Sequence, residues 1–168
     1  MSKEPISVKK RNGRGVEPLD LEKIHVMVEE ATKGVAGVSA SQVEIQSGIQ
    51  FYDGISTEEI QEILIRSASD LIDLEHPNYQ FVAARLLLFA IRKSLYGKIR
   101  EIPHLESHII DCVSKEVYDA AIYDKYSKEE IAEANGFIDH TRDFLFTYAG
   151  LRQVVDKYLV QDRSTGKV

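Results

Sequence analysis

The segment from Asn78 to Tyr96 constrains the fold of this chain more strongly than any other part of the sequence. Apolar residues occupy most sides of the helix that it would form, and Gly97 follows as a residue that readily ends a helix. A helix that is apolar on most sides needs neighbouring elements to cover it. The sequence therefore predicts a mainly α fold in which 78–96 is the central helix.

Three shorter helices are expected before this central helix. Asp20 is the expected N-cap of the first, which ends at Gly34, and the second begins at 39–41. Ser56 and Glu59 have the spacing of a capping box that starts the third. The expected apolar residues are Ile24, Val28 and Ala31 at helical spacing in the first helix, Val43, Ile45 and Ile49 in the second, and a stripe of Ile60, Ile63, Leu64, Ala68, Leu71 and Ile72 in the third.

A β-hairpin is expected in front of the helices. Residues 6–9 alternate apolar and polar side chains, and Asn12-Gly13 is a strong turn signal because both residues tolerate positive φ. Residues 16–19 return along the hairpin, and Pro18 points to an edge strand or to the end of pairing. The sequence thus predicts a four-helix bundle that is capped by an N-terminal hairpin.

The rest of the chain is expected to form a partial helical domain. Residues 98–103 have the composition of a linker, which divides the chain into domains at 1–97 and 98–168. We expect the second domain to be incomplete, because a strand and a turn close to the last residue indicate a missing neighbour. Its elements are expected to be helices at about 104–117, 127–136 and 139–155, a strand at 157–160 and a turn at 162–166.

Composition argues against two kinds of partner. No run of about 18 apolar residues is present, so no membrane span is expected. The net charge of −6 argues against a nucleic-acid polymer as the ligand. Cys112 is the single cysteine, so no internal disulfide is possible, which fits a cytoplasmic location.

The N-terminal segment is basic although the chain as a whole is acidic. Five cations against Glu4 give residues 1–14 a local charge of +4, which suits a compact anion better than a polymer. The alternative is a solvated hairpin whose charges only aid solubility. The five cations are Lys3, Lys9, Lys10, Arg11 and Arg14.

Several groups are candidates for binding a triphosphate. No G-x-x-x-x-G-K-[ST] loop is present, so a different site has to be considered. Lys10 and Arg11 on the hairpin, Thr57 at a helix start and Lys93 near a helix end supply the cations and amides that phosphates require. Each also has a structural explanation, since Thr57 can belong to a cap and Lys93 can offset the helix dipole.

Longer motifs resemble a known family. Residues 8–13, 21–25 and 49–57 resemble the ATP-cone domain, and 77–86 resembles a signature of class I ribonucleotide reductase large subunits. Beyond the cone, Tyr96-Gly97, 138–143 and 157–166 resemble the start of the helical domain of the same enzymes.

The resemblance implies an allosteric site that binds ATP as activator and dATP as inhibitor, with Mg²⁺. It implies that Lys10 and Lys93 hold phosphates and that Thr57 contacts phosphate through its hydroxyl and amide. Glu17 would lie near the adenine and Ile24 would form an apolar wall. The residues expected to bind the nucleotide are Lys10, Arg11, Glu17, Pro18, Leu19, Asp20, Leu21, Glu22, Lys23, Ile24, Thr57 and Lys93.

The sequence departs from the family pattern in two ways. The hairpin loop at 12–16 is one residue longer than in familiar members, which affects the position of Glu17. Gln61 and Ala90 stand where some members place histidines near the phosphates. The departures leave the expectation of ATP binding in place and weaken that of tight dATP inhibition.

The resemblance does not imply catalysis by this chain alone. Ribonucleotide reduction requires three thiols, and Cys112, which lies among apolar residues, is expected to be a buried structural cysteine. His104 and His108 share a helix face, but a structural role is preferred to metal binding. We expect a regulatory segment that acts with the remainder of the large subunit and with a radical-generating small subunit. The alternatives are an interaction module without nucleotide binding and a nonfunctional remnant.

Overall fold

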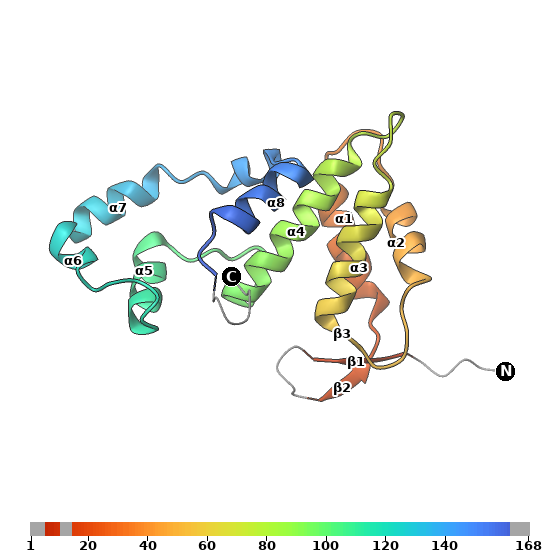
Figure 1. The fold of residues 1–168 in the computed structure, drawn as a ribbon, viewed down its shortest axis with the longest axis horizontal. Helices are drawn as coiled ribbons and strands as arrows, with labels where there is room; N and C mark the ends of the chain where they lie inside the picture. Colours follow the sequence, from red (N-terminus) through yellow and green to blue (C-terminus); the bar gives the residue numbers. More distant parts are fainter. Residues whose placement is uncertain (1–5, 11–14, 162–168) are drawn as a thin grey trace.

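The computed structural model describes residues 6–10 and 15–161, and most of them are helical (Figure 1). This confirms the mainly α fold with an N-terminal hairpin. In chain order the elements are β1 (Ser7–Lys9), β2 (Val16–Pro18), α1 (Leu21–Thr32), α2 (Ala40–Gly48), β3 (Ile55–Ser56), α3 (Thr57–Asp70), α4 (Tyr79–Tyr96), α5 (Leu105–Ser114), α6 (Ile122–Lys125), α7 (Lys128–Gly136), the 3-10 helix η1 (His140–Leu145) and α8 (Tyr148–Lys157).

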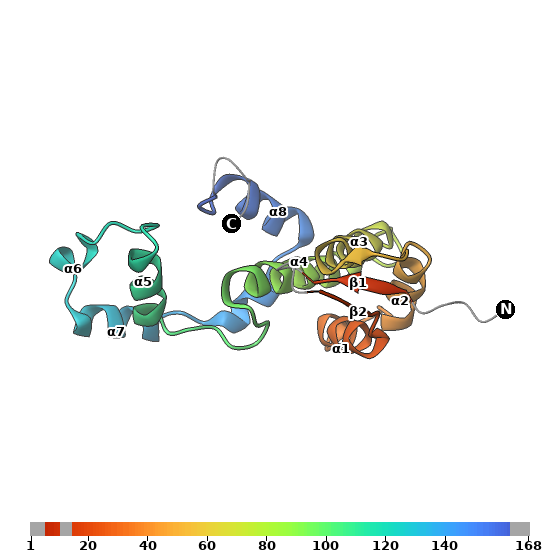
Figure 2. The ribbon, with the colours of Figure 1, turned by 90° about the horizontal axis from the view of Figure 1, so that it is seen from below.

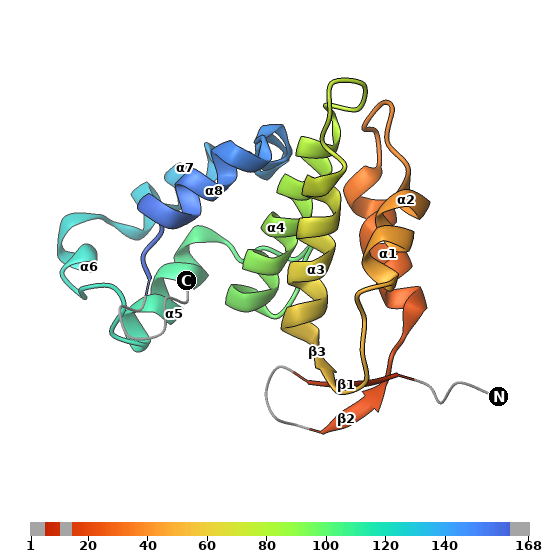
Figure 3. The same ribbon diagram turned by 45° about the vertical axis from the view of Figure 1, so that its right-hand side comes forward.

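A small sheet closes one end of the bundle of α1–α4 (Figure 3). β1 pairs antiparallel with β2 and parallel with β3, in the order β2-β1-β3. Pro18 lies on an edge strand, as predicted, whereas β3 was not predicted. Gly54, with φ of +80°, turns the chain into β3, and its N–H donates to the carbonyl of Ser7 at 2.9 Å. The predicted Asn12-Gly13 turn lies outside the described residues.

Local capping signals fix the ends of the helices. The Asp20 carboxylate accepts from the amides of Glu22 and Lys23 at the start of α1. Ser56 and Glu59 form the predicted capping box of α3. Gly97 ends α4 in the left-handed conformation that glycine adopts without strain.

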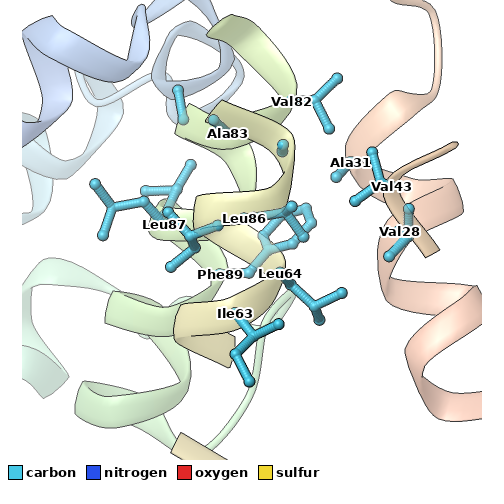
Figure 4. Packing of buried hydrophobic residues seen from close by; sticks show 14 of the residues in the cluster. Val28, Ala31, Val43, Ile63, Leu64, Val82, Ala83, Leu86, Leu87 and Phe89 are labelled. Atoms are coloured by element: carbon cyan, nitrogen blue, oxygen red, sulfur yellow. The ribbon is translucent and has the colours of Figure 1, made fainter. Parts of the chain in front are cut away.

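Helix α4 is the centre of the core, as predicted. It packs against α1 and α3 on one side and against α8 on another (Figure 4). Leu86 of α4, Leu64 of α3 and Val28 of α1 are fully buried. The same apolar cluster includes Leu151 and Val155 of α8. One core therefore contains residues from both sides of the predicted linker at 98–103.

The apolar residues of α2 do not all face the core. Val43 and Ser47, one turn apart, are fully buried, whereas Ile45 and Ile49 are exposed. Of the three apolar residues expected on this helix, only Val43 therefore faces the core. Ile45 follows Val43 by two residues, which places it on the opposite side of the helix.

Helices α5–α7 stand apart from the bundle, and the chain then returns so that α8 lies along α4 (Figure 2). Within this part α5 packs on α7, with Ile109, Cys112 and Ile131 buried. The amide of Leu105 donates to Asn135 Oδ1 at 2.9 Å, which ties the start of α5 to the end of α7.

Two predictions for the last third of the chain were wrong. The expected helix at 139–155 is divided into η1 and α8, because Phe146 is extended and Thr147 caps α8 through the amide of Gly150. The expected strand at 157–160 is absent from the described residues. There the amides of Tyr158 and Leu159 donate to the Val154 carbonyl and so continue the last turn of α8. The short helix α6 was not predicted.

Candidate functional site

A cleft of about 80 Å³ opens between the sheet and the ends of three helices. Strand β2 and the start of α1 form one side of it, and the first turn of α3 and the last turn of α4 contribute to the other. Its lining residues are Val8, Glu17, Pro18, Leu19, Asp20, Lys23, Ile24, Met27, Thr57, Ile60, Gln61 and Lys93.

Two carboxylates that line this cleft each hold a lysine. Lys10 Nζ lies 2.7 Å from Glu17 Oε2, and Lys23 Nζ lies 3.1 Å from Asp20 Oδ2. The hydrogen bond from Lys10 holds the pKa of Glu17 below its ordinary value. The bond between Asp20 and Lys23 lowers the pKa of the carboxyl and raises that of the ammonium. The carboxylates of Glu17 and Asp20 and the ammonium of Lys23 are therefore charged at neutral pH.

The N-terminus of α3 faces the cleft at Thr57, the first residue of the helix. The carboxylate of Glu59 accepts from the Ser56 amide at 2.9 Å and from the Tyr52 hydroxyl at 2.7 Å. These bonds hold it in the cap, where they lower its pKa. The first turn of α3 presents the positive end of its dipole, which suits an anion.

Most of the residues predicted to bind a nucleotide come together here. Eight of them line the cleft, whereas Lys10 does not line it but pairs with Glu17, which does. Leu21 and Glu22 do not line it, since Leu21 is largely exposed and Glu22 lines a neighbouring cavity. Arg11 lies outside the described residues. The eight are Glu17, Pro18, Leu19, Asp20, Lys23, Ile24, Thr57 and Lys93.

The prediction missed four lining residues, Val8, Met27, Ile60 and Gln61. Met27 follows Ile24 by three residues, and this helical spacing is a signal that would have found it. Gln61 is buried and donates from Nε2 to the carbonyl of Leu86 at 3.1 Å. Its amide therefore braces α3 against α4 at a position where some family members place a histidine.

A larger cavity of about 560 Å³ adjoins the cleft. The two share Lys23, Met27 and Lys93 as lining residues. Phe89 adds an apolar surface from α4, and Arg100 comes from the segment that follows α4. The neighbouring cavity thus combines apolar walls with charged groups of both signs.

The histidines and the cysteine of α5 form a separate cluster. The His108 ring lies edge-on to Tyr96 and Tyr118, and its Nε2 is 3.6 Å from Cys112 Sγ. His104 instead contacts the side-chain amide of Asn135 at 3.2 Å. Within residues 6–10 and 15–161, no group of three or more His, Cys, Asp or Glu side chains is arranged to hold a metal ion.

Among the described residues, no helix has both the length and the apolar character that a membrane span requires.

Comparison with known proteins identifies the N-terminal part of the chain. Residues 6–94 match the ATP cone domain family. Among relatives, the ribonucleoside-diphosphate reductase subunit alpha of Haemophilus influenzae is 46% identical over 97% of this chain and 21% of its own length. The ribonucleoside-diphosphate reductase 1 subunit alpha of Escherichia coli is 45% identical over 96% of this chain and 21% of its own length. The subunit alpha of Enterobacteria phage T4 is 42% identical over 79% of this chain and 18% of its own length. The chain thus spans about a fifth of the length of these relatives. It belongs to the ATP-cone family, and its similarity to ribonucleoside-diphosphate reductase alpha subunits runs through nearly its whole length.

Proposed function

We propose that this chain is the nucleotide-sensing segment of a ribonucleotide reductase large subunit, which binds ATP or dATP as an allosteric effector. One observation carries the proposal: Thr57, Lys93 and the segment 17–20, which are far apart in the sequence, line a single cleft. The ATP-cone match and the relatives support the same reading. Catalysis is not assigned to this chain, because Cys112 is its single cysteine.

In this proposal the phosphates bind at the N-terminus of α3, where Thr57 offers its hydroxyl and amide. Lys93 and Lys10 supply positive charge, while the base and ribose lie along 17–23 against Ile24. A triphosphate carries about four negative charges, more than two lysines neutralise, so a cation is needed. Mg²⁺ is held mainly by phosphates and one or two carboxylates, and Asp20 provides a carboxylate in the cleft.

The cleft is small for a site that holds a nucleotide. Sites for small ligands have volumes of roughly 300–1,000 Å³, and this cleft has about 80 Å³. We therefore infer that the cleft widens when a nucleotide enters. Strand β2 is a three-residue edge strand, and the Lys10–Glu17 pair at its side is solvent-exposed. Such exposed pairs are weak, so breaking this one requires little free energy.

Isothermal titration calorimetry with ATP and dATP in the presence of Mg²⁺ tests the proposal. The purified 168-residue chain should bind ATP with a Kd in the micromolar to millimolar range. Absence of heat and of equilibrium-dialysis retention for both nucleotides would refute nucleotide sensing.

We further propose that residues 1–97 form the regulatory domain and that 98–168 belong to the helical domain of the large subunit. The partners are then the remainder of that subunit and the radical-generating small subunit, in the cytoplasm. Neither a nucleic-acid polymer nor a membrane is part of this proposal.

A second candidate function is an interaction module that has no nucleotide-dependent role. Large apolar side chains are exposed in the part after α4, and a partner that covers them would favour this function. Equilibrium dialysis separates the candidates, since retention of ATP is expected only for the sensor. The most exposed of these side chains are Phe137, Leu145, Tyr158 and Val160.

A further inference from the structure

Lys10, which the proposed function assigns to the phosphates, is engaged by a carboxylate of its own hairpin. Its Nζ lies 2.7 Å from Glu17 Oε2. The strand register places Glu17 opposite Val8, and the amide of Lys10 donates to the Gly15 carbonyl at 3.1 Å. The hairpin therefore brings this lysine and this glutamate together through its own backbone pairing.

Glu17 is also part of the cleft. It is a lining residue together with Thr57 and Lys93. Its carboxylate thus occupies a cation that an incoming anion needs. Both members of the pair are partly exposed, with 47% of the Lys10 side chain and 36% of the Glu17 side chain accessible. Either side chain can leave the other without opening the core.

Asp20 does not act in the same way, although it pairs with Lys23. Its Oδ1 accepts from the amides of Glu22 and Lys23 as the N-cap of α1. Displacing it would leave the start of that helix uncapped, which is unfavourable. Glu17 has no comparable role in a helix cap, so its contact with Lys10 is the exchangeable one.

We propose that Glu17 is a built-in competitor of the effector phosphates for Lys10. In the absence of effector it neutralises the lysine, and an incoming triphosphate replaces the carboxylate as the partner of the ammonium. This inference rests on the proposed function, since it concerns the same cleft. Its consequence is that Glu17 lowers the affinity for phosphates and that its release accompanies binding.

Titration calorimetry with inorganic tripolyphosphate tests this proposal. The probe has no base or ribose, so a contact between Glu17 and adenine does not influence the result. The full chain is compared with Glu17→Gln, Lys10→Gln, the double variant, and Glu62→Gln. Glu62 is exposed on α3 outside the lining of the cleft, and its substitution removes the same net charge.

We expect Glu17→Gln to strengthen tripolyphosphate binding about two- to fivefold, the range for an exposed ion pair. The same substitution in the Lys10→Gln background should give no gain, because the competition requires the lysine. Glu62→Gln should leave the affinity unchanged. All variants alter exposed side chains, and their unfolding curves verify that they fold.

Two results would overturn the competitor role and leave nucleotide sensing intact. One is ATP binding by the unaltered chain with no gain from Glu17→Gln. The other is a gain of equal size with and without Lys10, which would indicate simple repulsion by the carboxylate. Failure of the unaltered chain and of Glu17→Gln to bind ATP or tripolyphosphate would remove both proposals together.

Discussion

Arg92 of α4 donates from Nη2 to Oδ2 of Asp143 in η1 at 2.7 Å, and this ion pair joins the bundle to the last third of the chain. The Arg92 side chain is only 8% exposed. The ring of Phe144 lies near the guanidinium groups of Arg85 and Arg92, at 5.2 and 5.6 Å from its centroid. Charge and cation–π contacts thus hold η1 on α4.

Replacing Asp143 with alanine should destabilise the protein. Arg92 would retain a buried charge without its acceptor, which costs about 1–3 kcal/mol. Urea unfolding monitored by circular dichroism measures the loss. Asp111→Ala is the matched control, because the Asp111–Lys115 pair is exposed on α5 and contributes about 0.5 kcal/mol or less. Equal losses in the two variants would show that the Arg92 pair contributes no more than a surface pair.

Leu86→Ala should lower the free energy of unfolding by about 2–5 kcal/mol. Leu86 is fully buried at the centre of α4, and its truncation leaves a cavity between α4 and its neighbours. Leu74→Ala makes the same chemical change at a fully exposed position, where an effect within about 0.5 kcal/mol is expected. Denaturant unfolding of both variants checks the contrast, and a loss below about 1 kcal/mol for Leu86→Ala would contradict the central position of α4.

The contact of His25 with α2 predicts a dependence of stability on pH. His25 Nδ1 lies 2.8 Å from Glu44 Oε1, and its Nε2 lies 3.3 Å from Glu29. The bond to Glu44, followed by the charge of Glu29, raises the pKa of His25 above its ordinary value of 6.5. The protonated ring therefore stabilises the folded state.

Because the pKa is raised by folding, the stabilisation is fully present below pH 6.5 and is lost as the pH rises through the folded-state pKa. His25→Gln should remove this part of the pH dependence, and Glu44→Gln should reduce it. Unfolding curves at a series of pH values from about 5 to 9 measure the effect. A parent chain and a His25→Gln variant with the same pH profile would show that this contact has no role.

Lys93→Ala should weaken ATP binding about tenfold or more, since a charge-assisted hydrogen bond to phosphate is lost. Lys93 lines the cleft from α4. Lys115→Ala is the control, because this lysine directly follows α5, pairs with Asp111 and does not line the cleft. Calorimetry with ATP compares the two, and unchanged affinity in Lys93→Ala would remove this lysine from the site.

The sequence by itself determined the features that depend on neighbours within one or two turns. The Asp20 cap, the Ser56–Glu59 capping box and the glycine stop after α4 were predicted because each acts on amides or carbonyls a few residues away. The apolar character of α4 predicted its central position for a related reason, since such a helix must be covered. The resemblance of the long motifs to a known family also predicted the candidate residues of a nucleotide site.

Tertiary structure decided the features that join distant segments. β3 is a two-residue strand that exists because β1 is beside it, and the break between η1 and α8 accompanies the docking of Asp143 and Phe144 on α4. The exposure of Ile45 depends on which face of α2 meets its neighbours. The convergence of Thr57 and Lys93 likewise arises only when the folded backbone brings these segments together. Such contacts leave no local pattern in the sequence, because their free energy comes from groups that the unfolded chain keeps apart.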